Sequence, residues 1–150
     1  MANEAKTYAI FRDMLRSKGY YDDKDVVVEE QKSDNAKIDK LLKNASKKGN
    51  KNGYPDFILY SKAYPELIIV VEADINKHES ETQDNYADYA VDGALLYASF
   101  LSKEFDVLAI GISGEEEHRF KMSHYLHLKD DKKAYPLFDD ILLTVKEYFD

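Results

Sequence analysis

The chain has 150 residues, of which 44% are hydrophobic and 13% aromatic, enough apolar material for one globular domain with its own core. Its formal net charge of -8 argues against strong nucleic-acid binding by this domain alone, because affinity for phosphates comes mainly from lysine and arginine. Cysteine is absent, which excludes disulfides and thiolate metal sites, and no apolar run has the length of a signal peptide or a membrane span. We therefore expect a cytoplasmic protein that makes no contact with a membrane.

The N-terminal part of the sequence alternates helix and strand signals. Residues 4–17 carry apolar side chains at three- and four-residue spacing and stop before Gly19, which predicts an amphipathic helix. The β-branched run that begins at Val26 predicts a strand. Residues 36–45 predict a second helix, and the polar residues 44–52 that follow predict a flexible loop.

Short apolar runs and one long periodic segment dominate the rest of the chain. Two runs separated by a turn predict a hairpin whose second strand is buried on both faces and lies centrally in a sheet. A long helix with an apolar stripe, two further strands and a last helix beginning at Pro136 are expected after it. The ranges are 57–60 and 67–73 for the hairpin, 81–102 for the long helix, and 105–113 and 119–128 for the later strands.

The order of these elements predicts the fold class. Helices and strands alternate without internal repeats or a linker, which favours an α/β protein with a mixed central sheet flanked by helices. Residues 1–150 therefore form one expected domain. Its ending in a helix favours an N-terminal module of a longer enzyme, although a domain of this length could also stand alone.

Acidic side chains stand at the ends of the two hairpin strands. Asp56 begins the first strand, and Glu72 and Asp74 lie two positions apart at the end of the second, so the latter two share a face. Pairing of the strands would bring Asp56 within one strand spacing of Glu72, so that three carboxylates could converge. Clustered anions at a buried sheet end are stabilised by a hard divalent cation such as Mg²⁺.

These residues resemble a known motif. Asp56 after Pro55, followed by Glu72 at the end of an apolar strand, resembles the PD-(D/E)xK nuclease superfamily. The surrounding sequence resembles the N-terminal nuclease domains of type I restriction subunits and of restriction enzymes fused to an adenine methylase, and this likeness covers nearly the whole chain. The segments that carry it are residues 3–7, 29–33, 41–49 and 88–93.

The resemblance implies a restriction-endonuclease-like fold and Mg²⁺-dependent hydrolysis of phosphodiester bonds in DNA. In that reading Asp56, Glu72 and the main-chain carbonyl of Ala73 hold the cation. Glu4 resembles an accessory acid, and Gln83 resembles a supporting glutamine beside the phosphate. Glu4 could instead be a first-turn acid favoured by the helix dipole, and Gln83 an ordinary helix residue.

The lysine of the motif is missing. Asp74 occupies its position, two residues after Glu72, and a carboxylate cannot orient the attacking water or stabilise charge on the phosphate as lysine does. Lys77 could act as a surrogate. Asp74 could add a third anionic ligand, or it could only mark the exit from the strand or cap a helix beginning near Ile75.

Lysines gather before the motif, in the segment that ends near residue 52. They could approach the DNA backbone or could form a solvated surface. Those assigned to DNA contact are Lys43, Lys47, Lys48 and Lys51.

Three functions therefore compete. The first is a Mg²⁺-dependent endonuclease domain of a restriction-modification enzyme that acts on DNA, with recognition supplied by other domains or subunits. The second is a catalytically inactive module of the same fold with a structural or DNA-positioning role. The third is a cytosolic interaction domain without a nucleic-acid role. The four histidines predict no shared metal site, because His124 and His127 fall on opposite faces of a strand.

Overall fold

The computed structural model of the chain describes residues 4–49, 54–86 and 88–149, and within them the strands form one six-stranded sheet. The strands lie in chain order across the sheet, so each pairs with its sequence neighbours. They are β1 (Val26–Glu29), β2 (Phe57–Ser61), β3 (Leu67–Asp74), β4 (Asp106–Ser113), β5 (Lys121–His127) and β6 (Tyr135–Asp139).

One pair of strands is parallel. β2 and β3 form the expected antiparallel hairpin, whereas β3 and β4 run parallel and are joined by a crossover through α3 (Ala90–Leu101). Every residue of β3 except Asp74 is buried, as expected of a central strand covered on both faces. The parallel pair places the ends of β3 and β4 at the same edge of the sheet.

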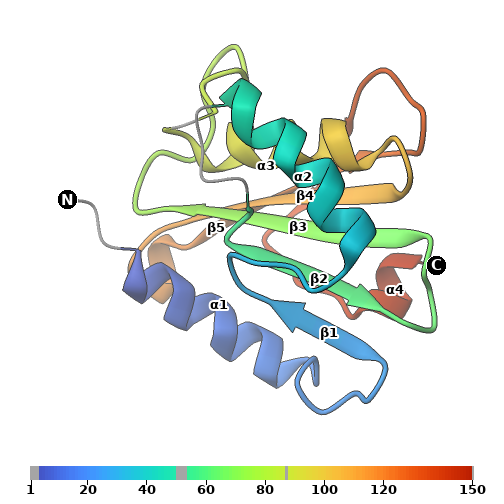
Figure 1. The fold of residues 1–150 in the computed structure, drawn as a ribbon. Helices are drawn as coiled ribbons and strands as arrows, with labels where there is room; N and C mark the ends of the chain where they lie inside the picture. Colours follow the sequence, from blue (N-terminus) through green and yellow to red (C-terminus); the bar gives the residue numbers. More distant parts are fainter. Residues whose placement is uncertain (1–3, 50–53, 87, 150) are drawn as a thin grey trace.

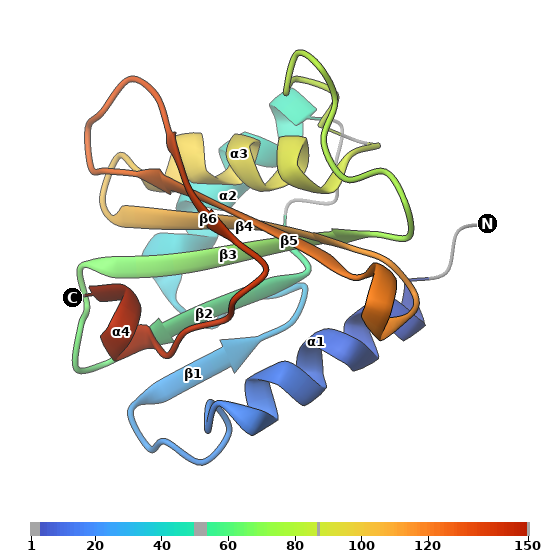
Figure 2. The same ribbon diagram turned by 180° about the vertical axis from the view of Figure 1, so that it is seen from behind.

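Helices cover both faces of the sheet (Figures 1 and 2). α1 (Ala5–Ser17) and the short α4 (Val145–Phe149) pack on one face, and α2 (Ala36–Gly49) and α3 pack on the other. The protein is thus an α/β structure with a mixed sheet between helices, compatible with a restriction-endonuclease-like fold. Among the described residues, no helix combines the length and apolarity needed to cross a membrane.

The alternation of β3 explains why the sheet has a separate core on each face. Ile69 and Val71 point into the core beneath α1, and Ile68 and Val70 point into the core beneath α3. On the α3 side the packing is close: a Cβ added at Gly111 of β4 would lie 2.6 Å from Cγ2 of Val91. Gly111 pairs with Glu72 in the strand register, so the first turn of α3 is held near the end of β3.

The prediction of a long helix over residues 81–102 is wrong about where the helix starts, because α3 begins at Ala90. The cause is Asp92, a fully buried acid in the first turn of α3. Its carboxylate accepts backbone N–H groups from Ser80 at 3.1 Å and Asn85 at 2.8 Å, and also the hydroxyl of Ser80. These contacts fold the preceding loop back over the helix start.

The C-terminal expectation is also wrong. Residues 135–139 form the edge strand β6 instead of the start of a helix, and only residues 145–149 are helical. The backbone N–H of Asp140 donates to the Met122 carbonyl at 2.8 Å, and the Met122 N–H donates to the Asp140 carboxylate at 2.9 Å. Pairing the open edge of β5 therefore outweighs the helical periodicity of the apolar residues.

The loop expected over residues 44–52 is wrong for its first part, because α2 continues to Gly49. The remainder of that expectation, residues 50–52, lies outside the described residues.

Candidate functional site

The hairpin brings Asp56 and Glu72 face to face at one end of the sheet. The register pairs Phe57 with Val71, so the residue before Phe57 lies opposite the residue after Val71. Each acid binds the other strand's backbone: the Asp56 N–H donates to Glu72 Oε1 at 2.9 Å, and the Ala73 N–H donates to Asp56 Oδ2 at 2.7 Å. This reciprocal pair fixes both carboxylates where β2 begins and β3 ends.

α1 contributes a phenol to the same place. The hydroxyl of Tyr8 donates to Asp56 Oδ1, and the Gln31 side-chain amide donates to the Tyr8 oxygen at 3.0 Å. Burial, followed by the charge of Asp56, raises the pKa of Tyr8 above its ordinary value. Tyr8 therefore remains a neutral proton donor to the carboxylate, a role that the sequence did not reveal.

The acids border a small polar cavity of about 90 Å³. Its lining combines residues from the start of α1, the hairpin and the approach to α3, namely Glu4, Asp56, Glu72, Ala73, Asp74, Asp88 and Tyr89. Nevertheless, within the described ranges no three acidic or histidine side chains gather closely enough to hold a metal ion. The expected convergence of three carboxylates is therefore not found.

The Asp74 carboxylate binds the backbone that follows it. Its Oδ2 accepts the N–H of Asn76 at 3.1 Å and the N–H of Lys77 at 2.7 Å. These short-range bonds form an Asx-type turn at the exit of β3. Asp74 thus lies at the strand's exit, but in the described part of the chain no helix begins near Ile75, because the next helix, α3, starts at Ala90.

Lys77 lies beside one of the residues that line the cavity. Its ammonium nitrogen is 5.9 Å from the centre of the Tyr89 ring, and Tyr89 is one of the lining residues. The Lys77 carbonyl accepts the N–H of Ala90, which ties this segment to the start of α3. A lysine from outside the motif position therefore neighbours the cavity lining.

Tyr97 of α3 is a further polar group that sequence reasoning missed. Its side chain is fully buried, and no hydrogen-bond partner for its hydroxyl occurs in the described part of the chain. Burial raises its pKa most, and the charges of Glu72 and then Asp56 raise it further, so the phenol lies within electrostatic reach of both acids. Its place in an apolar helical stripe gave only a packing signal.

Gln83 is not among the residues that line the carboxylate cavity. It lies in the loop before α3 with a positive φ of 60°, and its side-chain amide donates to Tyr125 at 3.1 Å and to Glu79. The expectation that Gln83 stands beside the phosphate depended on a helix that does not reach it.

The lysine-rich segment remains a prediction. Lys43 is exposed and pairs with Asp39 of the same helix at 3.3 Å. Lys47 and Lys48 belong to α2 but their side chains are outside the described part, and Lys51 lies outside the described residues altogether.

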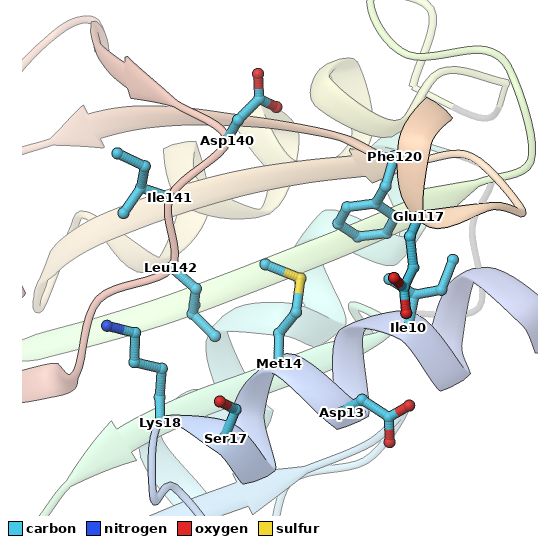
Figure 3. A pocket seen from close by; sticks show the side chains of 10 residues that line it. All are labelled: Ile10, Asp13, Met14, Ser17, Lys18, Glu117, Phe120, Asp140, Ile141 and Leu142. Atoms are coloured by element: carbon cyan, nitrogen blue, oxygen red, sulfur yellow. The ribbon is translucent and has the colours of Figure 1, made fainter.

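A larger hollow lies elsewhere, between α1 and the segment that leads to α4 (Figure 3). It measures about 730 Å³, and Figure 3 shows the Met14, Phe120 and Leu142 side chains along it. Because its floor is largely apolar, it offers surface for packing, whereas the small cavity concentrates the oxygen donors.

The two acids at the small cavity carry the kind of donor that Mg²⁺ prefers. Asp56 and Glu72 supply carboxylate oxygens, and Ala73 lines the cavity with them. Mg²⁺ prefers hard oxygen ligands and keeps several waters, so a few protein oxygens would suffice to hold it.

The fold and the paired acids thus fit the restriction-endonuclease-like class of α/β proteins. In a comparison with known sequences, the chain is 33% identical over 132 residues to the type II restriction enzyme and methyltransferase RM.BcgI of Heyndrickxia coagulans. The alignment covers 78% of this chain and 20% of the relative, so the chain matches about a fifth of that protein's length. No protein-family model and no solved structure matches the chain.

Proposed function

We propose that the chain is a Mg²⁺-dependent DNA endonuclease domain of the PD-(D/E)xK type, acting within a restriction-modification enzyme. The observation that carries this proposal is the reciprocal pairing of Asp56 and Glu72 across the β2–β3 hairpin. The relationship to a restriction enzyme fused to a methyltransferase supports the choice of DNA as substrate.

In this proposal Asp56, Glu72 and the Ala73 carbonyl hold the cation. Such an ion, when bound, polarises the scissile phosphate and lowers the pKa of a coordinated water. The protein holds Asp56 through Ala73 N–H and Tyr8, and it keeps Glu72 only 4% exposed, which limits competition from bulk water. Lys77, at the Tyr89 side, supplies positive charge to the phosphate in place of the motif lysine.

Other domains or subunits supply most of the DNA affinity. A net charge of -8 repels a polyanion, so a domain of this kind needs a partner to bring DNA to it. The relative, in which the matched region is about a fifth of a restriction enzyme and methyltransferase, has room for such domains.

A second function is favoured by Asp74. Its carboxylate is committed to a turn at the position where the motif places lysine, and this supports a catalytically inactive module with a structural or DNA-positioning role. The two functions share the fold and differ in one side chain.

Cleavage of supercoiled plasmid with Mg²⁺ or Mn²⁺ tests the choice, with the chain at high concentration to offset weak DNA binding. Four proteins are compared: the wild type, Glu72→Gln, Asp74→Lys and Asp74→Asn. Cleavage by the wild type that Glu72→Gln abolishes supports the nuclease. Cleavage by Asp74→Lys alone supports the inactive module, and the absence of both cleavage and cation binding in every protein overturns both.

A further inference from the structure

The Tyr8 hydroxyl donates to Asp56, which lines the cavity, but Tyr8 itself is not one of the lining residues. We propose that Tyr8 is a positioning residue that sets the affinity of the site for its divalent cation by fixing the rotation of the Asp56 carboxylate. This inference rests on the proposed function, since it concerns the same site.

The carboxylate of Asp56 is held at both oxygens by donors from different elements. Ala73 N–H of β3 binds Oδ2 at 2.7 Å, and the Tyr8 hydroxyl of α1 binds Oδ1. With a single donor the carboxylate could rotate about its last bond, because that torsion is soft. With two donors on separate oxygens, one orientation is selected.

The bond from Tyr8 is compatible with a bound cation. Each oxygen of an ionised carboxylate has about two lone-pair positions, so one hydroxyl donor on Oδ1 does not by itself exclude a metal ion from that oxygen. This is the arrangement by which outer groups commonly tune metal ligands.

The Tyr8 hydroxyl is itself held in place by the core. Its side chain is 9% exposed, and its ring packs on Phe57 with centroids 5.1 Å apart. The guanidinium of Arg12 lies 5.4 Å from the ring centre, and Arg12 also pairs with Glu30. Movement of the Tyr8 ring would therefore disturb its contacts with Phe57 and Arg12.

Gln31, Tyr8 and Asp56 form a chain of hydrogen bonds in which each residue donates to the next. The Gln31 amide donates to the Tyr8 oxygen at 3.0 Å, and Tyr8 donates in turn to Asp56. Accepting a hydrogen bond makes a hydroxyl a better donor, so Gln31 strengthens the bond to Asp56. Gln31 lies two residues after the end of β1, at an exposed position where its φ is a positive 61°.

The test is cation binding by the 150-residue chain, measured by isothermal titration calorimetry with Mg²⁺ and with Ca²⁺, and it needs no DNA cleavage. Tyr8→Phe removes one hydroxyl and keeps the ring. We expect it to weaken cation affinity by about 10–100-fold, the usual effect of losing an outer-shell partner. Gln31→Leu should weaken it in the same direction by a smaller factor.

Tyr20→Phe is the matched control. Tyr20 belongs to the same core, is 3% exposed, and donates its hydroxyl to the Leu143 carbonyl, away from the carboxylates. Tyr8→Phe loses its hydrogen bonds to Asp56 and Gln31, and Tyr20→Phe loses its bond to Leu143, so a decrease in thermal stability is expected of both. Only Tyr8→Phe should change cation affinity.

Equal cation affinities for Tyr8→Phe and Tyr20→Phe, with normal binding by the wild type, would overturn the positioning role and leave the nuclease proposal standing. A wild type that binds neither cation would instead overturn the metal site and the positioning role with it. Should Tyr8→Phe fold poorly, Gln31→Leu at an exposed position decides: unchanged affinity there contradicts the proposal.

Discussion

Asp56 and Asp74 are both acids beside Glu72, but they use their carboxylates in opposite ways. Asp56 reaches across the hairpin to Ala73 and receives the Tyr8 hydroxyl from α1. Within the described ranges, Asp74 binds the N–H groups of residues two and three positions ahead. The first acid is oriented by tertiary structure, and the second by a local turn.

Asp56 therefore belongs to a site assembled from several elements, whereas Asp74 belongs to a local turn of the chain. Long-range donors hold Asp56 toward Glu72, where oxygen atoms can share a cation. Asp74 is satisfied by its own segment and needs no partner from another element. Similar residue types at neighbouring positions therefore need not act together, and substitution of each acid should have a distinct result.

The largest effect is expected at Asp56. Asp56→Ala removes the acceptor for Ala73 N–H and for the Tyr8 hydroxyl, at a cost of about 1–3 kcal/mol in the free energy of unfolding for each donor left unsatisfied. Cation affinity should fall by more than about 100-fold, since a ligand matters at least as much as an outer-shell group. Urea unfolding and titration calorimetry measure the two effects.

Asp56→Asn is its control, because a carboxamide keeps an acceptor oxygen but loses the charge. It should lose cation affinity with a smaller loss of stability. Retained affinity in Asp56→Asn would contradict the metal role of Asp56.

Asp74→Lys comes next. It restores lysine two residues after Glu72. We expect plasmid cleavage at least about 10-fold faster than that of the wild type, because a single group that stabilises transition-state charge commonly changes the rate by that much or more. Loss of the turn cap should cost about 1 kcal/mol. Asp74→Asn, which preserves the capping oxygen, should match the wild type in both stability and rate; a gain of cleavage there would refute the lysine explanation.

Lys77→Ala should reduce any cleavage by the wild type by about 10-fold, because it removes the positive charge beside Tyr89, which lines the cavity. Stability should change by less than about 0.5 kcal/mol, since the side chain is exposed. Lys103 is a matched control, being an exposed lysine whose ammonium lies 5.1 Å from the Phe100 ring centre. Equal rates for Lys77→Ala and Lys103→Ala would remove Lys77 from the proposal.

The smallest effect concerns Tyr97. Removing an unsatisfied buried hydroxyl should leave the free energy of unfolding unchanged or raise it by about 1 kcal/mol. Tyr20→Phe, which loses a satisfied hydrogen bond, should lower it by a similar amount. Chemical denaturation of both variants compares the two, and a clear loss of stability in Tyr97→Phe would show that its hydroxyl is satisfied in solution.

The sequence by itself determined the elements whose signals are local. The helix ending before Gly19, the hairpin of β2 and β3 and the buried strand β4 follow from periodicity, turn residues and apolar runs. The strand positions of Asp56 and Glu72 follow from the same patterns. The turn made by Asp74 was also within reach, because its partners are two and three residues away.

Tertiary structure decided the rest, because the deciding contacts join residues far apart in the sequence. Asp92 draws Ser80 and Asn85 over the start of α3, and the open edge of β5 converts an apolar helical pattern into β6. Tyr8 meets Asp56 only because α1 packs beneath the hairpin. Periodicity predicts which side of an element is buried, but the partner of a polar side chain is set by how the elements pack together.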